Sequence, residues 1–267
     1  MTYRHLVEAE ELLQGHDAVV FDCRFALADA AAGRARYDEG HIPGAHFIDL
    51  NSDLSAPAGQ HGGRHPLPAP AAFAATLADF GVDRQTDVIA YDDAGFGFVG
   101  RLWWMMRSLG YRPPRLLNGG YQAFVAAGGQ PQLEVPQAQP CPVPEPGEWQ
   151  GVCDIHGVRA AQTSGALLVD SRDAARYQGL EEPIDPVAGH IPGAINRPWA
   201  QLQEADGKIA PVSQLESHWE EVLQAEQVVV YCGSGVSACA NLFSLALLGR
   251  DDAVLYAGSW SDWCSHL

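Results

Sequence analysis

One cysteine stands where a covalent catalyst is expected. Cys232 lies in the segment VVVYCGSGVSACANL, residues 228–242, whose apolar start predicts a strand and whose small residues predict a tight loop before a helix. The loop consists of Gly233, Ser234, Gly235, Val236 and Ser237. Ligands of open α/β sheets bind beyond the carboxyl ends of the strands, so the cysteine is placed to act as a nucleophile.

The loop supplies the electrostatics that this chemistry needs. Gly233 and Gly235 permit backbone angles that other residues resist, so successive backbone N–H groups can point inward as an anion-binding nest around the sulfur. The helix that begins near Ala238 adds the positive end of its dipole. Both contributions favour the thiolate, the nucleophilic form of cysteine. The alternative is that Cys232 is a small buried residue at the end of a strand.

The loop lacks an arginine, which argues against one class of reaction. A cysteine phosphatase grips the phosphoryl oxygens with an arginine of the same loop, and the corresponding position here is Ala238. The loop therefore disfavours the hydrolysis of phosphate esters.

The two halves of the chain repeat the same blocks in the same order. The motif GHIPGA occurs at residues 40–45 and again at 189–194. AVVFDCRF (18–25), DVIAYDD (87–93) and LLNGGYQAF (116–124) correspond to ALLVDSRD (166–173), QVVVYCG (227–233) and LYAGSWSDW (255–263). Such order predicts a duplication. The residue that matches Cys232 in the first copy is Asp92, so only the second copy carries the nucleophile.

The elements that must position this loop are strands and helices in alternation. The strand candidates are short apolar runs, as in strands buried on both faces of a parallel sheet, and amphipathic helices such as residues 70–81 and 211–224 follow them. This predicts an α/β fold of two parallel sheets, each flanked by helices. We expect a non-catalytic domain at residues 1–128, a linker rich in Pro and Gln at 129–150, and a catalytic domain at 151–267.

Composition excludes some classes of function. The chain has 267 residues, 47% of them apolar, and a net charge of −17, so it can form real cores but lacks the clustered cations that nucleic acid requires. No apolar run is long enough to span a bilayer, and the first turns are charged, so we expect neither a membrane segment nor a signal peptide but a cytoplasmic protein. The six cysteines show no zinc-binding spacing, and we expect no metal.

The motifs together resemble tandem-domain sulfurtransferases of the rhodanese superfamily. The resemblance covers nearly the whole chain and depends on GHIPGA in both copies, a single cysteine at the head of CGSGVSA, and GSWSDW near the end. The loop CGSGV resembles that of 3-mercaptopyruvate sulfurtransferases, whereas thiosulfate sulfurtransferases more often carry basic residues after the cysteine. A dianion such as thiosulfate gains from those cations, so the loop favours mercaptopyruvate.

The resemblance implies a mechanism without a cofactor. The Cys232 thiolate takes a sulfur from 3-mercaptopyruvate, with thiosulfate as a second candidate donor, and the resulting persulfide passes it to a thiol such as thioredoxin or glutathione, or to cyanide. Two half-reactions predict ping-pong kinetics. Two alternatives stay open: a thiosulfate:cyanide sulfurtransferase, and a non-enzymatic tandem module that binds a sulfur carrier or another partner.

The resemblance also implies partners for the cysteine. Ser234 corresponds to a loop serine that works with an aspartate and a histidine of the first copy, for which Asp53 and His65 are the candidates. The alternative interpretations are a helix cap for Asp53 and an ordinary loop histidine for His65. Trp260 is expected either to line the substrate pocket or to pack in the hydrophobic core.

Two arginines hold the substrate carboxylate in the family, and Arg176 matches the first. The second falls in EEPIDPVAGH, which contains no arginine but includes Asp185. Arg172 and Arg64 are the remaining candidates, although Arg172 is expected to pair with nearby carboxylates, as its counterpart in DCR of the first copy should. The other substrate-binding candidates are the loop residues Gly233, Gly235, Val236 and Ser237.

The remaining histidines and cysteines of note are expected to be structural. His41 and His190 belong to the GHIPGA turns, which occur in both copies and therefore also in the one without a nucleophile. Cys239 and Cys264 are taken as buried structural residues.

Overall fold

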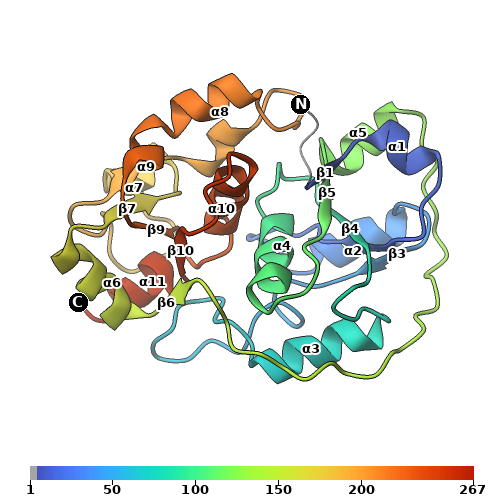
Figure 1. Cartoon of the computed structure of the whole chain (residues 1–267), viewed down its shortest axis with the longest axis horizontal. Helices are drawn as coiled ribbons and strands as arrows, with labels where there is room; N and C mark the ends of the chain where they lie inside the picture. The colour runs from blue at the N-terminus through green and yellow to red at the C-terminus, as the bar shows by residue number, and fades with distance from the viewer. Residues whose placement is uncertain (1–4) are drawn as a thin grey trace. The chain divides into compact units, whose positions relative to one another are not determined.

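The computed structural model describes residues 5–267 and divides into two compact units (Figure 1). The first unit runs to Ala56 and includes Pro68–Gln150 and Gln203–Ile209, and the second consists of Pro57–Leu67, Gly151–Leu202 and Ala210–Leu267. The division by packing thus differs from a cut near residue 128. A segment of the first repeat, Pro57–Leu67, packs with the second sheet, and the expected linker packs with the first unit.

The sheet of the first unit has five parallel strands in the order β1-β5-β4-β2-β3. In chain order they are β1 (Leu6–Val7), β2 (Val19–Asp22), β3 (Ala45–Phe47), β4 (Val88–Tyr91) and β5 (Arg115–Leu117). The helices are α1 (Ala9–Leu13), α2 (Ala32–Glu39), α3 (Pro70–Asp79), α4 (Val99–Ser108) and α5 (Gly120–Ala126). One face of the sheet packs on α1 and α5, and α4 contacts β4 and β5.

The second sheet repeats this order as β6-β10-β9-β7-β8, again parallel. Its strands are β6 (Val152–Cys153), β7 (Leu167–Asp170), β8 (Ile195–Asn196), β9 (Val228–Tyr231) and β10 (Val254–Tyr256). Its helices are α6 (Ile155–Ser164), α7 (Ala174–Tyr177), the 3-10 turn η1 (Trp199–Leu202), α8 (Val212–His218), α9 (Glu220–Gln224), α10 (Ala238–Leu247) and α11 (Ser259–Cys264). The predicted duplication and α/β fold are therefore confirmed.

Both faces of the second sheet are covered, which explains the continuous apolar runs of its strands. Val229 and Tyr231 of β9 pack with residues of α6 and α11, so the alternate residues Val228 and Val230 face the other side. There α10 contacts β9 and β10 (Figure 1). The helix expected over residues 211–224 is interrupted at Trp219, whose buried indole donates a hydrogen bond of 2.9 Å to Ser244 Oγ.

The GHIPGA histidines occupy equivalent structural positions in the two units. His41 stacks on Tyr37 with ring centroids 3.9 Å apart and its Nδ1 lies 2.9 Å from the Tyr37 carbonyl. His190 stacks on Tyr177 at 4.0 Å, with Nδ1 2.7 Å from that carbonyl. Both rings therefore fix the turn to the preceding helix, as their occurrence in both copies predicted.

None of the helices within residues 5–267 combines the length and apolar character that crossing a bilayer needs.

Candidate active site

Cys232 lies directly after β9, at the carboxyl end of the second sheet, and is buried. Its sulfur accepts a hydrogen bond of 3.1 Å from the backbone N–H of Gly235. Its own N–H donates to Ser259 Oγ at 3.0 Å, and that hydroxyl donates to the Tyr256 carbonyl. Ser259 has a φ of 55°, a strained conformation for a serine. Sequence reasoning missed Ser259, which ties the cysteine to the start of α11.

The two loop glycines are needed for different reasons. Gly235 has a φ of 75°, and a Cβ there would lie 2.2 Å from the carbonyl oxygen of Ala257, so no other residue fits. Gly233 has no left-handed conformation, but a Cβ there would lie 3.0 Å from Nη2 of Arg64 and 3.5 Å from both terminal nitrogens of Arg176. Gly233 therefore makes room for two guanidinium groups. The sequence named both arginines as candidates but did not reveal that they lie beside this glycine.

Ser234 and His65 share a hydrogen bond of 2.8 Å between Oγ and Nδ1, and both side chains are buried. The histidine belongs to the segment Pro57–Leu67, which packs within the second unit. The neighbouring Arg64 donates its N–H to Ser261 Oγ of α11 at 3.1 Å. Of the expected relay, the structure thus brings together the serine and the histidine.

Asp53 belongs to the first unit and closes a turn there. Its Oδ2 accepts the N–H of Asp49 at 2.7 Å, and its Oδ1 accepts the hydroxyl of Ser52 at 3.2 Å. Burial raises the pKa of the carboxyl group, against the lowering effect of these hydrogen bonds. No helix begins at Asp53 in the described structure, so these contacts belong to a turn and not to a helix cap, and the part of Asp53 in a relay stays a prediction.

The arginines near Cys232 form ion pairs with carboxylate groups. Asp185, which lies in the segment EEPIDPVAGH, forms ion pairs with both Arg64 and Arg176. Arg176 also pairs with Glu182 at 2.7 Å. Burial alone would raise the pKa of Glu182, but the hydrogen bonds from Arg176 and from the backbone N–H groups of Asp185 and Ile184, together with the charge of Arg176, lower it. The acidic residues thus fix the two guanidinium groups next to Gly233.

Arg172 has a different, structural role. It forms a bidentate pair with Asp170 and donates to the carbonyl of Gly189 at 2.7 Å. In the first unit, Arg24 makes the same contacts with Asp22 and with the carbonyl of Gly40. The repeated arrangement leaves Arg64 and Arg176 as the candidates for anion binding.

The loop of the first unit shows what such a loop can hold. The buried Asp92 carboxylate, which stands in place of the cysteine, accepts the backbone N–H groups of Ala94, Phe96, Phe98 and Val99 at 2.9–3.3 Å. Burial raises the pKa of Asp92 despite these bonds. The first copy therefore fills its anion nest with its own side chain, whereas the second copy has a neutral loop around a thiol.

The remaining residues named from sequence have structural contacts. Trp260 is buried, donates from Nε1 to the carbonyl of Val187 at 2.8 Å and lies under the Arg172 guanidinium at 4.9 Å.

The other cysteines and loop residues named from the sequence also have structural contacts. The thiol of Cys239 donates to the carbonyl of Gly235 at 3.4 Å. Burial raises the pKa of Cys264 to about 11. Val236 is buried beside the cysteine, and Ser237 occupies the N-cap position of α10.

Comparison with known protein families agrees with the two-sheet architecture of the chain. The model of the rhodanese-like domain matches twice, over residues 6–127 and 156–266. The chain belongs to the rhodanese family. The family resemblance predicted from the motifs is confirmed. The first match covers β1 to β5 of the first sheet, and the second covers β7 to β10 of the second sheet.

Curated relatives of this rhodanese-family chain are sulfurtransferases. A probable 3-mercaptopyruvate sulfurtransferase of Pseudomonas aeruginosa is 42% identical over 98% of this chain and 96% of its own length. The 3-mercaptopyruvate sulfurtransferase of Escherichia coli is 33% identical over 85% of this chain and 81% of its own. The thiosulfate sulfurtransferase of Cricetulus griseus is 30% identical over 98% and 92%.

Among solved structures, the 3-mercaptopyruvate sulfurtransferase from Leishmania major superposes with a TM-score of 0.85 at 29% identity, covering 100% of this chain and 76% of that one. These relatives agree with the predicted sulfurtransferase activity.

Proposed function

We propose that this chain transfers sulfur from 3-mercaptopyruvate through a persulfide on Cys232. The observation that carries the proposal is the placement of the Arg64 and Arg176 guanidinium groups beside Gly233, the residue that follows the cysteine. Two fixed cations next to a nucleophile suit a small donor with a carboxylate. The buried pair of Ser234 and His65 adds a hydroxyl that can bind the keto group.

In the first half-reaction the Cys232 thiolate attacks the sulfur of mercaptopyruvate. The bond between that sulfur and the donor's carbon breaks, and its electron pair leaves on the carbon as the enolate of pyruvate. The proton of the donor's thiol then ends on that carbon, which gives pyruvate and an anionic persulfide. Ser234 and His65 are placed to carry this proton. The Gly235 N–H, which now bonds the sulfur at 3.1 Å, stabilises the charge.

In the second half-reaction an acceptor removes the outer sulfur. A thiolate of thioredoxin or glutathione attacks it to form a new persulfide, or cyanide attacks it to form thiocyanate, and Cys232 returns as a thiolate. No redox change of a cofactor is involved. The proposal includes a cytoplasmic location, because all six cysteines are unpaired in the structure and free thiols are typical of a reducing compartment.

Mass spectrometry after incubation with the donor tests the nucleophile. Mercaptopyruvate should add the mass of one sulfur atom to the wild-type chain and none to a Cys232→Ser variant, which should fold but lack turnover. Substantial turnover by the variant would contradict the proposal, and absence of any adduct on the wild type would favour the non-enzymatic alternative.

Thiosulfate is the second candidate donor, because two guanidinium groups also suit a dianion. The ratio of kcat/KM for the two donors decides between them. We expect mercaptopyruvate to be preferred, because the loop itself contributes no cation after Cys232.

A further inference from the structure

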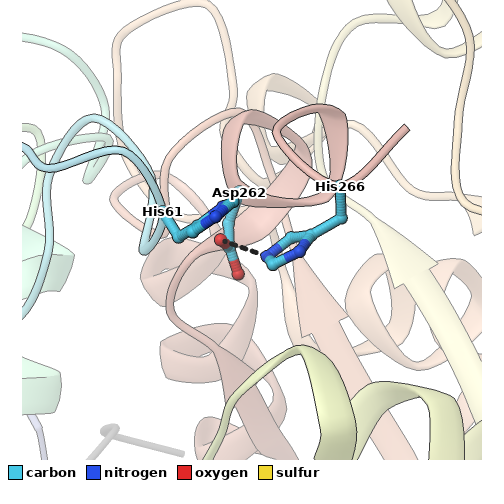
Figure 2. Close-up of side chains that lie close together, drawn as sticks. All are labelled: His61, Asp262 and His266. Atoms are coloured by element: carbon cyan, nitrogen blue, oxygen red, sulfur yellow. Dashed lines mark hydrogen bonds and ion pairs between the residues drawn. The ribbon is translucent and has the colours of Figure 1, made fainter.

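Three side chains of the second unit that can ligate metals meet beside α11. His61, Asp262 and His266 have ligand atoms that all lie within 4.8 Å of one another. Figure 2 shows His61 arriving from a separate loop, whereas Asp262 and His266 belong to the C-terminal segment. We propose that these three residues bind one zinc ion, independently of the sulfur-transfer site.

His61 is held in the tautomer that a metal needs. The hydroxyl of Ser265 donates its proton to the carbonyl of Asp262 at 2.7 Å, so it can only accept a hydrogen bond from Nδ1 of His61, which lies 2.7 Å away. The neutral ring therefore carries its proton on Nδ1 and presents the lone pair of Nε2. Metal-binding histidines characteristically donate their second ring nitrogen in this way.

Asp262 is oriented by two further donors. Its Oδ2 accepts the hydroxyl of Tyr256 at 2.7 Å, and its Oδ1 accepts the backbone N–H of Gly62 at 2.7 Å. Because each oxygen can accept more than one bond, Oδ1 can still bind a cation.

His266 completes the group from the exposed side. Its Nε2 lies 3.3 Å from Oδ1 of Asp262, and its ring stacks on that of His61 with centroids 4.2 Å apart. A tetrahedral zinc ion with ligand bonds near 2.1 Å places its ligand atoms about 3.4 Å apart. Because the two rings are nearly parallel, with an interplanar angle of 15°, the exposed His266 ring has to rotate about its side-chain bonds before both lone pairs point at one ion.

The set of donors suits zinc. Two imidazoles, one carboxylate and an open fourth position for water is an arrangement that zinc occupies in proteins. Gly62 and Asp262 also line a cavity of about 610 Å³, which leaves room for water on that side.

The fold brings the loop that carries His61 close to α11, as a shared metal site requires. Gly63 has a φ of 85°, and a Cβ there would lie 2.4 Å from the carbonyl oxygen of Gly258, so only glycine lets the loop approach the start of α11 so closely. A zinc ion would tie this loop, which also carries Arg64 and His65, to the end of the chain.

The test is calorimetric titration of the full chain, without a histidine tag, with zinc chloride. A Cys232→Ser background removes the active-site thiol as a competing ligand. We expect one zinc ion per chain. Ser265→Ala removes a residue that only orients a ligand, and should weaken zinc binding by about tenfold, within the roughly 10–100-fold range typical of such residues. His61→Ala and His266→Ala each remove a ligand and should weaken zinc binding by more than that range. His156→Ala, which removes an exposed histidine elsewhere in the unit, should change nothing.

Two results would overturn the proposal. One is zinc affinity in a His61→Ala/His266→Ala double variant equal to that of the background. The other is a sulfur-to-metal charge-transfer band when cobalt(II) replaces zinc, since the proposed ligands contain no sulfur. Zinc should also raise the melting temperature of the background chain by mass action, but not that of the double variant.

Discussion

The hydroxyl of Ser234 and Nδ1 of His65 lie 2.8 Å apart, although 169 residues separate them in the chain. A hydroxyl and an imidazole in contact can move a proton to or from a bound donor. Because Ser234 is only two residues from Cys232, the pair is placed to assist the sulfur transfer that we propose for this cysteine.

Removing either member of this pair should impair the mercaptopyruvate reaction. We expect Ser234→Ala and His65→Gln each to lower kcat by about 10²-fold, and the double variant to lose little more, because the two act as one unit. Thiosulfate turnover should fall less, since its leaving group needs no proton on carbon. Steady-state kinetics with both donors checks this, and losses that multiply in the double variant would contradict it.

Arg64→Gln and Arg176→Gln should each raise KM for mercaptopyruvate. The loss of one charge-assisted bond to the donor's carboxylate, worth about 1.5–3 kcal/mol, corresponds to a roughly 10–100-fold effect. Arg159→Gln is the matched control, because that arginine is exposed and lies over Trp263.

A second variant separates lost binding from lost structure at Arg64. Its removal leaves the buried Asp185 with fewer partners, so Arg64→Gln/Asp185→Asn should restore stability while KM stays high. Recovery of a wild-type KM in this double variant would show that Arg64 acts only as a structural partner.

The two loop glycines should respond differently to alanine. Gly235→Ala introduces a Cβ that clashes with a backbone carbonyl at a φ of 75°, so we expect a large loss of kcat and of stability. Gly233→Ala meets the Arg64 and Arg176 side chains instead, and should mainly raise KM. Thermal unfolding and donor kinetics on both variants distinguish these effects, and equal losses of stability would contradict the assignment.

Asp92 should stabilise the first unit because its carboxylate accepts four backbone N–H groups. Asp92→Ala leaves these buried donors without an acceptor, and we expect it to cost at least about 3 kcal/mol of unfolding free energy. Urea unfolding of this variant and of Glu39→Gln, an exposed control, measures the difference. A cost below that of the control would show that water replaces the carboxylate.

His218 should make stability depend on pH. Burial, with a smaller contribution from Arg197, lowers the pKa of His218 from 6.5 to about 4. The unfolded chain therefore takes up this proton first as the pH falls, so the contribution to stability is complete above pH about 6.5 and is lost between there and pH about 4. The loss amounts to about 3 kcal/mol at most.

His218→Gln should flatten this part of the pH profile of unfolding free energy, whereas His156→Gln, at an exposed position, should not. An unchanged profile in the first variant would assign the acid sensitivity to other groups.

The sequence determined the two parallel sheets and the position of Cys232, the proposed nucleophile. Apolar runs such as VVVY and the repeat of GHIPGA are local patterns that can be read directly from the sequence. A short strand that is apolar on both faces is typical of a parallel sheet covered by helices on both sides. The loop after Cys232 was predictable for the same reason, because its glycines and the following helix are contiguous in the chain.

Tertiary structure decided which loops lie beside Cys232. The segment Pro57–Leu67 lies in the first repeat but packs with the second unit, and it brings Arg64 to Asp185 across 121 residues and His61 to Ser265 across 204. Such loops have no hydrophobic period. Their positions follow from side-chain hydrogen bonds and from close approaches such as that of Gly63 to Gly258, which exist only once the second unit has folded.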